Sequence, residues 1–382
     1  MATKRQHFVP RVYMKAWETF VERKEEPSNK FRGVYVFKNN ESIGDGANRN
    51  SILWKPHLYT IGFNFFFITQ SCPLIYGDFV DKVYELMKNN SPMPIYGKLG
   101  YSVIKTKGSV KKHLPRIDEW EFYYEDGNLA RKKSIKSQID NLNSYVIEMA
   151  FDDCFEKKWE SVYNRFIDVV RNGKIVALGK SERIIPMQDA IDMLSFFFMF
   201  LCRSPYFDAM GIYSNIKARV LYPVFEQMCK GETDEGVSAE EIEELESEGR
   251  MYADDLMKGV WYSELYRMLF KRQGGFYHNI VLKAMEGCQM ILYEASDGAG
   301  TFITSDNPAF EHISKVEAIN RNGFLFPITP KYLLFIAKGM DDINIVAHKY
   351  ANTDTIRHFN RIIKQHKMDT LISVEKMIDR VL

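Results

Sequence analysis

The chain has 382 residues, of which 46% are hydrophobic, 14% aromatic and 26% charged, a composition typical of a protein with a substantial core. A disulfide-stabilised mini-protein and a wholly disordered chain are therefore excluded. Lys and Arg, 51 residues, balance 50 Asp and Glu residues, so any nucleic-acid-binding or membrane-binding surface has to be local.

Three features bear on where the protein works. Residues 1–11 include three basic residues, Lys4, Arg5 and Arg11, but no apolar stretch follows them, so the sequence predicts no secretory signal. The longest apolar run, residues 193–202, is well below the roughly 18–20 residues of a membrane-spanning helix and predicts a buried helix. The 5 cysteines include no C-x-x-C pair, which indicates reduced thiols. We expect a cytoplasmic protein that does not enter a membrane.

The first third of the chain mixes a short helix with strands. Pro10 suits the first turn of a helix, on which Tyr13, Trp17 and Phe20 would line one face. Runs of β-branched and aromatic residues between turn-forming clusters then predict strands at 34–37, 58–69 and 119–124.

From about residue 135 the hydrophobic pattern changes to a helical period. Apolar residues recur every three or four positions, which predicts one long helix, or two with a break. Further helices are expected within 183–230 and 238–271.

Strand patterns return after residue 288. Residues 290–295 and 301–304 flank a Gly-rich turn suited to a hairpin, and two more strands are expected at 332–337 and 343–347. Two segments with helical spacing close the chain, at 357–367 and 371–382.

Together these elements predict an α+β fold dominated by helices. A helical block at 135–287 would lie at the centre, and strands from the regions 1–134 and 288–382 would share one sheet. No internal repeat of 20–50 residues is visible, so we expect one large domain over residues 1–382.

The common catalytic motifs are absent. The chain has no phosphate-binding glycine loop, no H-E-x-x-H zinc motif and no G-x-S-x-G nucleophile elbow. A candidate site therefore has to be assembled from isolated polar residues.

His7 lies just before the predicted N-terminal helix. The positive end of a helix disfavours imidazolium, so a neutral His7 could act as a base or as a hydrogen-bond acceptor. Alternatively, His7 bonds a backbone group and fixes the entry of the chain into the helix.

Arg203 ends the apolar helix predicted at 187–202. An unpaired buried charge costs several kcal/mol, so Arg203 must meet an anion or carbonyl groups. The anion could be a phosphate or carboxylate of a substrate. A structural ion pair, or capping of the preceding helix, is the alternative.

Residues 304–308, T-S-D-N-P, follow a predicted strand. Asp306 could act as a general base, a metal ligand or a group that orients His7, while Ser305 and Asn307 would contact the substrate. Turn formation alone would also favour these residue types.

Basic residues gather in two places. Five of them occur without an intervening acid, namely Lys105, Lys107, Lys111, Lys112 and Arg116. On the helix predicted near the C-terminus, Arg361 shares one face with Arg357 and Lys364 and is a candidate substrate-binding residue. Both groups fit a nucleic acid partner, or an ordinary solvated helix face.

Four short segments resemble one bacterial protein family. They are HFVPRVYMKAW at 7–17, RSP at 203–205, TSDNP at 304–308 and FPITP at 326–330. In order and spacing they are similar to the family catalogued as domain of unknown function 4238, over nearly the whole chain. The resemblance implies a bacterial or phage-related cytosolic protein and no established reaction.

Two classes of function remain. The first is a hydrolase acting on nucleic acid or another phosphate ester, in phage defence or stress response. In this hypothesis His7 is the acid or base, Arg203 stabilises phosphate charge, and Asp306 orients His7 or holds a metal. Since the sequence supplies only two candidate metal ligands, we predict no bound metal and no other cofactor. The second is a binding or sensor module in which these polar motifs form a structural network. No protein partner can be named from the sequence.

Overall fold

The computed structural model describes residues 5–39, 41–56, 58, 73–144, 146–176, 181–205, 243, 247, 288–312, 323–338 and 343–382. Contacts between Cα atoms divide the chain into two compact units. Unit 1 takes in Met1–Thr3, Tyr59–Asp152 and Ala209–Arg267, and unit 2 takes in Lys4–Leu58, Asp153–Asp208 and Met268–Leu382. Each unit combines segments distant in the sequence. That the whole chain forms one domain stays a prediction.

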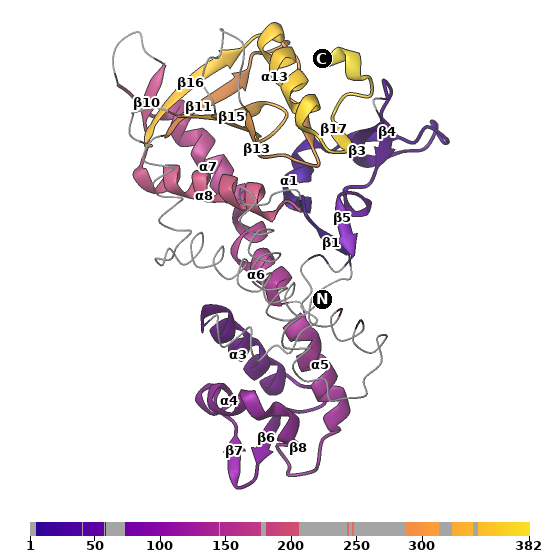
Figure 1. Cartoon of the computed structure of the whole chain (residues 1–382), viewed down its shortest axis with the longest axis vertical. Helices are drawn as coiled ribbons and strands as arrows, with labels where there is room; N and C mark the ends of the chain where they lie inside the picture. The colour runs from indigo at the N-terminus through magenta and orange to yellow at the C-terminus, as the bar shows by residue number, and fades with distance from the viewer. Residues whose placement is uncertain are drawn as a thin grey trace. The chain divides into compact units, whose positions relative to one another are not determined.

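Unit 1 contains a three-stranded antiparallel sheet in the order β7-β6-β8 (Figure 1). Its described elements are α3 (Pro73–Lys88), β6 (Ile95–Leu99), β7 (Ser102–Ile104), α4 (Lys107–His113), β8 (Glu121–Tyr124) and α5 (Lys132–Ser144). All three helices contact the sheet, and Ile95, Ile104 and Phe122 are buried between sheet and helices. This alternation of buried and exposed residues gives the sheet one apolar face.

The larger sheet of unit 2 has seven strands in the order β13-β14-β15-β11-β16-β10-β9. They are β13 (Phe310–His312), β14 (Gly323–Pro327), β15 (Tyr332–Lys338), β11 (Cys288–Ala295), β16 (Ile345–Ala351), β10 (Glu182–Ile184) and β9 (Lys174–Ile175). The central strand β11 is antiparallel to β15 and parallel to β16. Its nearly continuous apolar sequence suits a strand buried on both faces.

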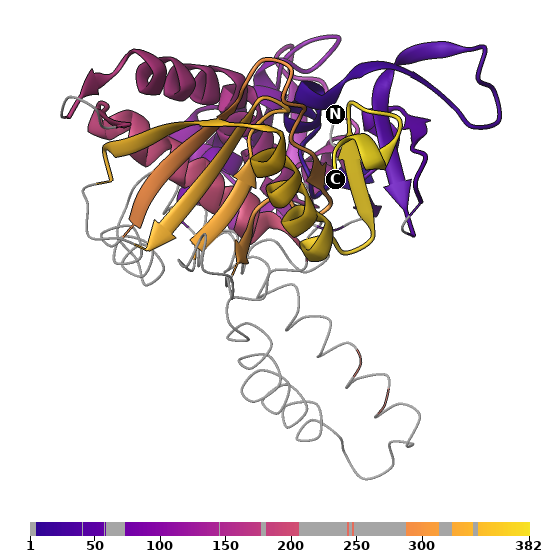
Figure 2. The ribbon, with the colours of Figure 1, turned by 90° about the horizontal axis from the view of Figure 1, so that it is seen from above.

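Helices cover both faces of this sheet, as Figures 1 and 2 show. They are α7 (Trp159–Asn172), α8 (Met187–Arg203) and α13 (Thr353–His366). On one face, Phe200 of α8 packs against Phe326 of β14. On the other face, Phe359 of α13 packs against Tyr293 of β11. Because successive residues of a strand face opposite sides, Glu294 lies on the face that α7 and α8 cover.

A second sheet in unit 2 joins strands from the two ends of the chain. Its order is β12-β17-β3-β2, with β4 beside β3. The strands are β2 (Thr19–Glu22), β3 (Lys30–Lys38), β4 (Asp45–Ala47), β12 (Thr304–Ser305) and β17 (Thr370–Ser373). Strands of the N-terminal and C-terminal regions therefore share this sheet, as predicted, but the other strands of both regions lie in separate sheets. A separate pair consists of β1 (Arg5–His7) and β5 (Trp54–Pro56).

The described residues confirm a mixed α+β fold, but helices do not clearly dominate it. The strands predicted at 34–37, 119–124, 290–295, 332–337 and 343–347 are found as β3, β8, β11, β15 and β16. The helical stretch predicted from residue 135 is found as α5, α6 (Val146–Cys154) and α7. The strand content exceeds the prediction because short strands, which leave little periodicity in the sequence, are paired by tertiary contacts.

Two sequence predictions at the chain ends are wrong. The N-terminal helix is short, with α1 (Arg11–Met14) followed by a 3₁₀ turn (Lys15–Trp17), and Phe20 lies exposed in β2. The segment predicted as a helix at 371–382 begins as β17, which pairs with β3, and ends in a 3₁₀ turn (Ile378–Arg380). In both places the apolar residues are placed by sheet pairing, which overrides a helix-like spacing.

The predicted hairpin of 290–295 with 301–304 does not form. β11 pairs with β15 and β16, whereas β12 pairs with β17. In the turn between β11 and β12, Gly298 and Gly300 both have positive φ, and the amide of Phe302 then bonds the carbonyl of Pro330. The turn leads the chain away from β11 because two left-handed residues redirect it, a conformation that glycine adopts without strain.

Several predictions fall outside the described residues. The predicted strand at 58–69 and the helices predicted between 206 and 271 lie there, apart from single positions. Among the described helices, none combines the length and apolar character that a bilayer crossing requires.

Candidate functional site

The structure brings His7 and Arg203 together through the backbone. Arg203 is 2% exposed, and its Nη2 donates a hydrogen bond of 2.7 Å to the carbonyl oxygen of His7. Its Nη1 lies 2.9 Å from Oε1 of Glu156. Arg203 thus meets both predicted kinds of partner, a carbonyl and an anion, and both belong to the protein.

The ring of His7 is held in its neutral form. Burial lowers the pKa of His7 to about 4, and the positive charge of Arg11 adds to this effect. Arg203 and Arg5 act in the same direction, opposed by a hydrogen bond with the backbone of Asn50. The prediction of a neutral imidazole is therefore correct in direction, although burial contributes most.

Asp306 has partners other than the predicted ones. Its side chain is buried, and its carboxylate accepts hydrogen bonds from the amides of Met368 (3.0 Å), Asp369 (2.7 Å) and Thr370 (3.1 Å). Burial raises the pKa of Asp306, while these three bonds lower it. Within the described residues it makes no bond to His7 or Arg203, and it fixes the connection between α13 and β17.

The rest of the T-S-D-N-P segment is also bonded to the protein. Ser305 Oγ donates to the carbonyl of Asn307 and accepts from its amide. Asn307 Nδ2 donates to the carbonyl of His366. Thr304 Oγ1 lies 2.7 Å from the hydroxyl of Tyr13, which donates to the carbonyl of Pro327.

We call His7, Tyr13, Arg203 and residues 304–307 the motif network. Its side chains mostly bond backbone groups of segments far away in the sequence, so they hold the chain in place. Arg361, the further predicted substrate-binding residue, lies exposed on α13 and has no ion-pair partner among the described residues.

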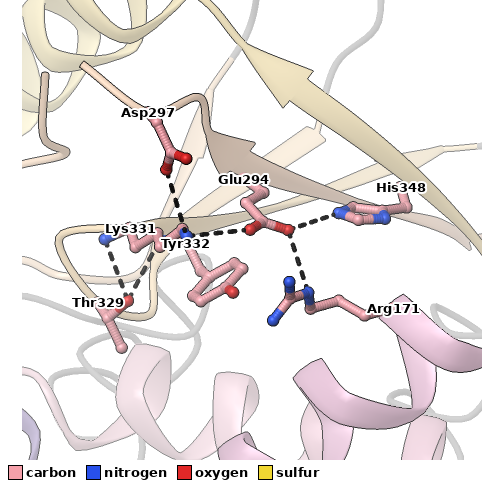
Figure 3. Close-up of polar contacts among 7 residues, drawn as sticks. All are labelled: Arg171, Glu294, Asp297, Thr329, Lys331, Tyr332 and His348. Carbon is pink, nitrogen blue, oxygen red and sulfur yellow. Dashed lines mark hydrogen bonds and ion pairs between the residues drawn. The ribbon is translucent and has the colours of Figure 1, made fainter. Parts of the chain in front are cut away.

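A second polar group in unit 2 was not predicted from the sequence. Glu294 of β11 is a buried carboxylate, and its Oε2 lies 3.0 Å from Nε2 of His348 on β16 (Figure 3). Nε of Arg171, at the end of α7, lies 3.5 Å from the same oxygen. Nζ of Lys331 lies 3.3 Å from Oε1. With Tyr332, which stands opposite Glu294 in β15, these residues form the Glu294 cluster.

The cluster contains a fixed negative charge. Burial raises the pKa of Glu294, but the hydrogen bonds from His348 and Lys331 and the charge of Arg171 outweigh it, so the pKa lies below its usual value. Glu294 is therefore ionised at neutral pH. An ionised carboxylate can only accept, so Nε2 of His348 donates the hydrogen bond to Glu294.

The cluster is open on one side. The side chains of Arg171 and Lys331 are 50% and 48% exposed, whereas that of His348 is 6% exposed. Nδ1 of His348 has no hydrogen-bond partner among the described residues. A base oriented by a buried acid thus lies beside two half-exposed cations, an arrangement that can bind an anion and move a proton next to it.

A turn positions Lys331 in this arrangement. Thr329 Oγ1 accepts hydrogen bonds from the amides of Lys331 and Tyr332, both 3.2 Å long. Asp297, in the turn after β11, lies 3.9 Å from Nζ of Lys331 and is fully exposed. The described residues contain no group of three or more His, Cys, Asp or Glu side chains suited to a metal ion.

One signal in the sequence could have identified the cluster. Glu294 interrupts the apolar run MILYEA, and His348 interrupts IVAHKYA. A carboxylate in a strand that is otherwise buried needs a partner, because an unpaired buried charge is costly. The sequence does not show which residue supplies that partner, since Arg171, Lys331 and His348 come from separate segments.

Comparison with known proteins adds a family and no function. No curated protein and no solved structure matches the chain. The family described as "Protein of unknown function (DUF4238)" matches residues 5–376, which is nearly the whole chain. The chain is therefore a member of the DUF4238 family.

Proposed function

We propose that the protein is a hydrolase of phosphate esters and that the Glu294 cluster is its active site. The proposal depends on one observation, the buried Glu294–His348 pair beside the half-exposed Arg171 and Lys331. The hydrolytic chemistry that the sequence suggested for His7, Arg203 and Asp306 is thereby assigned to the Glu294 cluster, whose two cations are half exposed. Nucleic acid is one candidate substrate.

Arg171 and Lys331 would bind the phosphate group. Each contacts Glu294 through a single polar atom at 3.3–3.5 Å, longer than the best charge-assisted hydrogen bonds, and half of each side chain is exposed. A guanidinium and an ammonium are the side chains that stabilise charge developing on phosphate oxygens. Glu294 keeps both cations in place when no ligand is bound.

His348 would act as the general base. Its Nδ1 takes a proton from water while the water oxygen forms a bond to phosphorus and the bond from phosphorus to the leaving oxygen breaks. The imidazolium then returns the proton to the leaving oxygen. Glu294 stabilises the imidazolium through Nε2 and acts as a positioning residue.

Turnover of simple esters tests the proposal. The full chain is assayed with p-nitrophenyl phosphate, bis(p-nitrophenyl) phosphate and single-stranded and double-stranded oligonucleotides. Removing a general base typically costs about 10²–10⁴-fold in rate, so His348→Ala should lose that factor. Added imidazole should restore part of the lost rate because it replaces the missing base. It would not restore activity that was lost through a structural defect. His358→Ala, on the opposite face of the sheet, is the matched control and should keep full activity.

A second candidate is the non-catalytic binding or sensor module. It is favoured by the motif network, whose predicted catalytic residues all bond within the protein. In that case the cluster would bind a phosphate-bearing ligand without turnover, and Arg171→Ala and Lys331→Ala would weaken binding.

Absence of turnover with every ester, or equal turnover in wild type and His348→Ala, would contradict the hydrolase. A cytoplasmic location and a role in stress response or phage defence stay predictions.

A further inference from the structure

The three-stranded sheet of unit 1 has a second face, which the proposed hydrolase site does not use. Because side chains alternate along strands, Tyr96 and Lys98 of β6 share one face with Val103 of β7 and Tyr123 of β8. The opposite face is the apolar one, which packs against α3, α4 and α5. We call the face of Tyr96 and Lys98, together with Lys105 at the end of β7, the tyrosine–lysine face.

The two lysines of this face rest on the tyrosine rings. Nζ of Lys98 lies 4.3 Å from the ring centre of Tyr123, and Nζ of Lys105 lies 4.1 Å from that of Tyr96. The two rings are themselves stacked, 5.7 Å apart with 23° between their planes. Neither lysine forms an ion pair within the described residues. The two positive charges are therefore held by rings and not by carboxylates.

Apolar and aromatic groups extend the face outward. Tyr101 is fully exposed at the tip of the β6–β7 hairpin, next to Gly100, whose positive φ forms the turn. Val103 is 50% exposed, and Leu129, bridged to Tyr123, is 67% exposed. Exposed apolar groups that gather in one place indicate a binding surface.

The charged side chains assigned to this face, Lys98, Lys105 and Glu121, have a positive sum. α4 packs against the opposite face of the sheet, so its exposed Lys111 and Lys112 do not add to the charge of the tyrosine–lysine face. Glu121 is the acidic residue of the same face in β8, and it accepts a hydrogen bond from the hydroxyl of Tyr123. Of the lysines predicted from the sequence as a basic group, Lys105 belongs to this face and has no ion-pair partner among the described residues.

We propose that the tyrosine–lysine face binds single-stranded nucleic acid. Unpaired bases would stack on Tyr123 and Tyr101, which are the accessible rings, and Lys98 and Lys105 would turn from the rings to the phosphates. A duplex would offer the phosphates but no base faces, and an acidic peptide would leave the rings uncovered. The proposal does not depend on the hydrolase, since none of its residues belongs to the Glu294 cluster.

Binding of labelled oligonucleotides to the full chain tests the proposal. Fluorescence anisotropy is measured with oligo(dT) and oligo(rU) of about fifteen nucleotides and with a duplex of the same length. We expect both single strands to bind more tightly than the duplex, with an affinity that falls as salt rises. The ratio of the dT and rU affinities shows whether DNA or RNA is preferred.

Matched variants locate the site. Tyr123→Leu should weaken binding about tenfold, the loss of one stacked base, whereas Tyr123→Phe keeps the ring and should bind nearly as wild type. Lys98→Gln with Lys105→Gln should reduce the slope of log affinity against log salt by roughly 0.7 for each lysine. Lys136→Gln, on α5 and paired with Asp118, removes the same charge elsewhere in unit 1 and should change nothing. Thermal melting of each variant confirms that it is folded.

Three outcomes would overturn the proposal. The first is no binding of either single strand, and the second is binding that the tyrosine and lysine variants leave unchanged. The third is binding of an oligo-glutamate peptide as tight as that of oligo(dT), which would identify an acidic protein as the partner. None of these outcomes bears on turnover at His348, so the two proposals fail separately.

Discussion

The motif network and the Glu294 cluster both place polar side chains in the interior of unit 2, but their partners differ. In the motif network, Asp306 and Asn307 bond backbone groups, and every partner is internal. In the Glu294 cluster, the carboxylate bonds other ionisable side chains, and two of these are half exposed. A side chain that satisfies backbone amides fixes the chain, whereas one that holds exposed cations also prepares them for a ligand.

The largest expected effect is the loss of stability when Asp306 of the motif network is replaced. Asp306→Ala leaves three backbone amides without acceptors in a buried position, which we expect to lower the free energy of unfolding by about 3–5 kcal/mol. Urea denaturation measures this. Asp369→Ala, at the exposed neighbour, is the control and should change stability by less than about 0.5 kcal/mol. A folded Asp306→Ala protein of normal stability would show that Asp306 has no structural role in the motif network.

Glu294→Gln should lower the stability of the protein, by an amount that depends on pH. Loss of the buried charge that pairs with His348, Arg171 and Lys331 should lower the free energy of unfolding by about 2–3 kcal/mol at pH 7. The folded-state pKa of Glu294 lies below its unfolded value of 4.5, so this contribution is present above that pH and is lost as pH falls through the lower folded-state pKa. Denaturation at pH 7 and pH 3 should show the gap between wild type and variant narrowing. A gap independent of pH would contradict the ionised Glu294.

His7 should make the stability of unit 2 depend on pH. Its folded-state pKa of about 4 lies below the ordinary 6.5, so between these values the unfolded chain binds a proton that the folded chain does not. Stability therefore falls as pH drops from 6.5 to 4, by about 2 kcal/mol after allowance for the partial exposure of the ring. His7→Gln should remove this slope, measured as the difference from wild type, while His358→Gln should leave it. An equal slope in all three proteins would show that His7 is not held neutral.

The smallest expected effect concerns the hydroxyl of Tyr13. Tyr13→Phe keeps the ring in the core but removes the bonds to Thr304 and to the carbonyl of Pro327, at a cost of about 1–2 kcal/mol. Tyr350→Phe, at a ring that is 69% exposed, should cost close to nothing. Thermal melting compares the two. Equal melting temperatures would show that the hydroxyl of Tyr13 does not stabilise the fold.

Much of the fold could be predicted because it depends on local patterns. Apolar spacing located α7, α8, β11 and β15, and the N-terminal and C-terminal strands were correctly expected to share a sheet. Errors occurred where pairing partners are distant. The segment after residue 370 has a helical spacing, yet its backbone bonds to β3, more than 300 residues away in the sequence.

The candidate site was harder to predict for the same reason. The sequence drew attention to Asp306 and Arg203 because each stands in a short distinctive motif, and both proved to bond within the protein. Glu294 stands in no motif. Its partners lie on α7, in the turn before β15 and on β16, so only the assembled sheet brings them within hydrogen-bond distance.

The sequence by itself determined the α+β class, most of the longer helices and strands, and the need for Arg203 to find a carbonyl or an anion. These follow from periodicity and from the cost of burying an unpaired charge, which act residue by residue. The tertiary structure alone decided which polar residues meet and which cations stay exposed. That depends on contacts between distant segments, whose geometry is set by packing of the whole unit and not by any one stretch of chain.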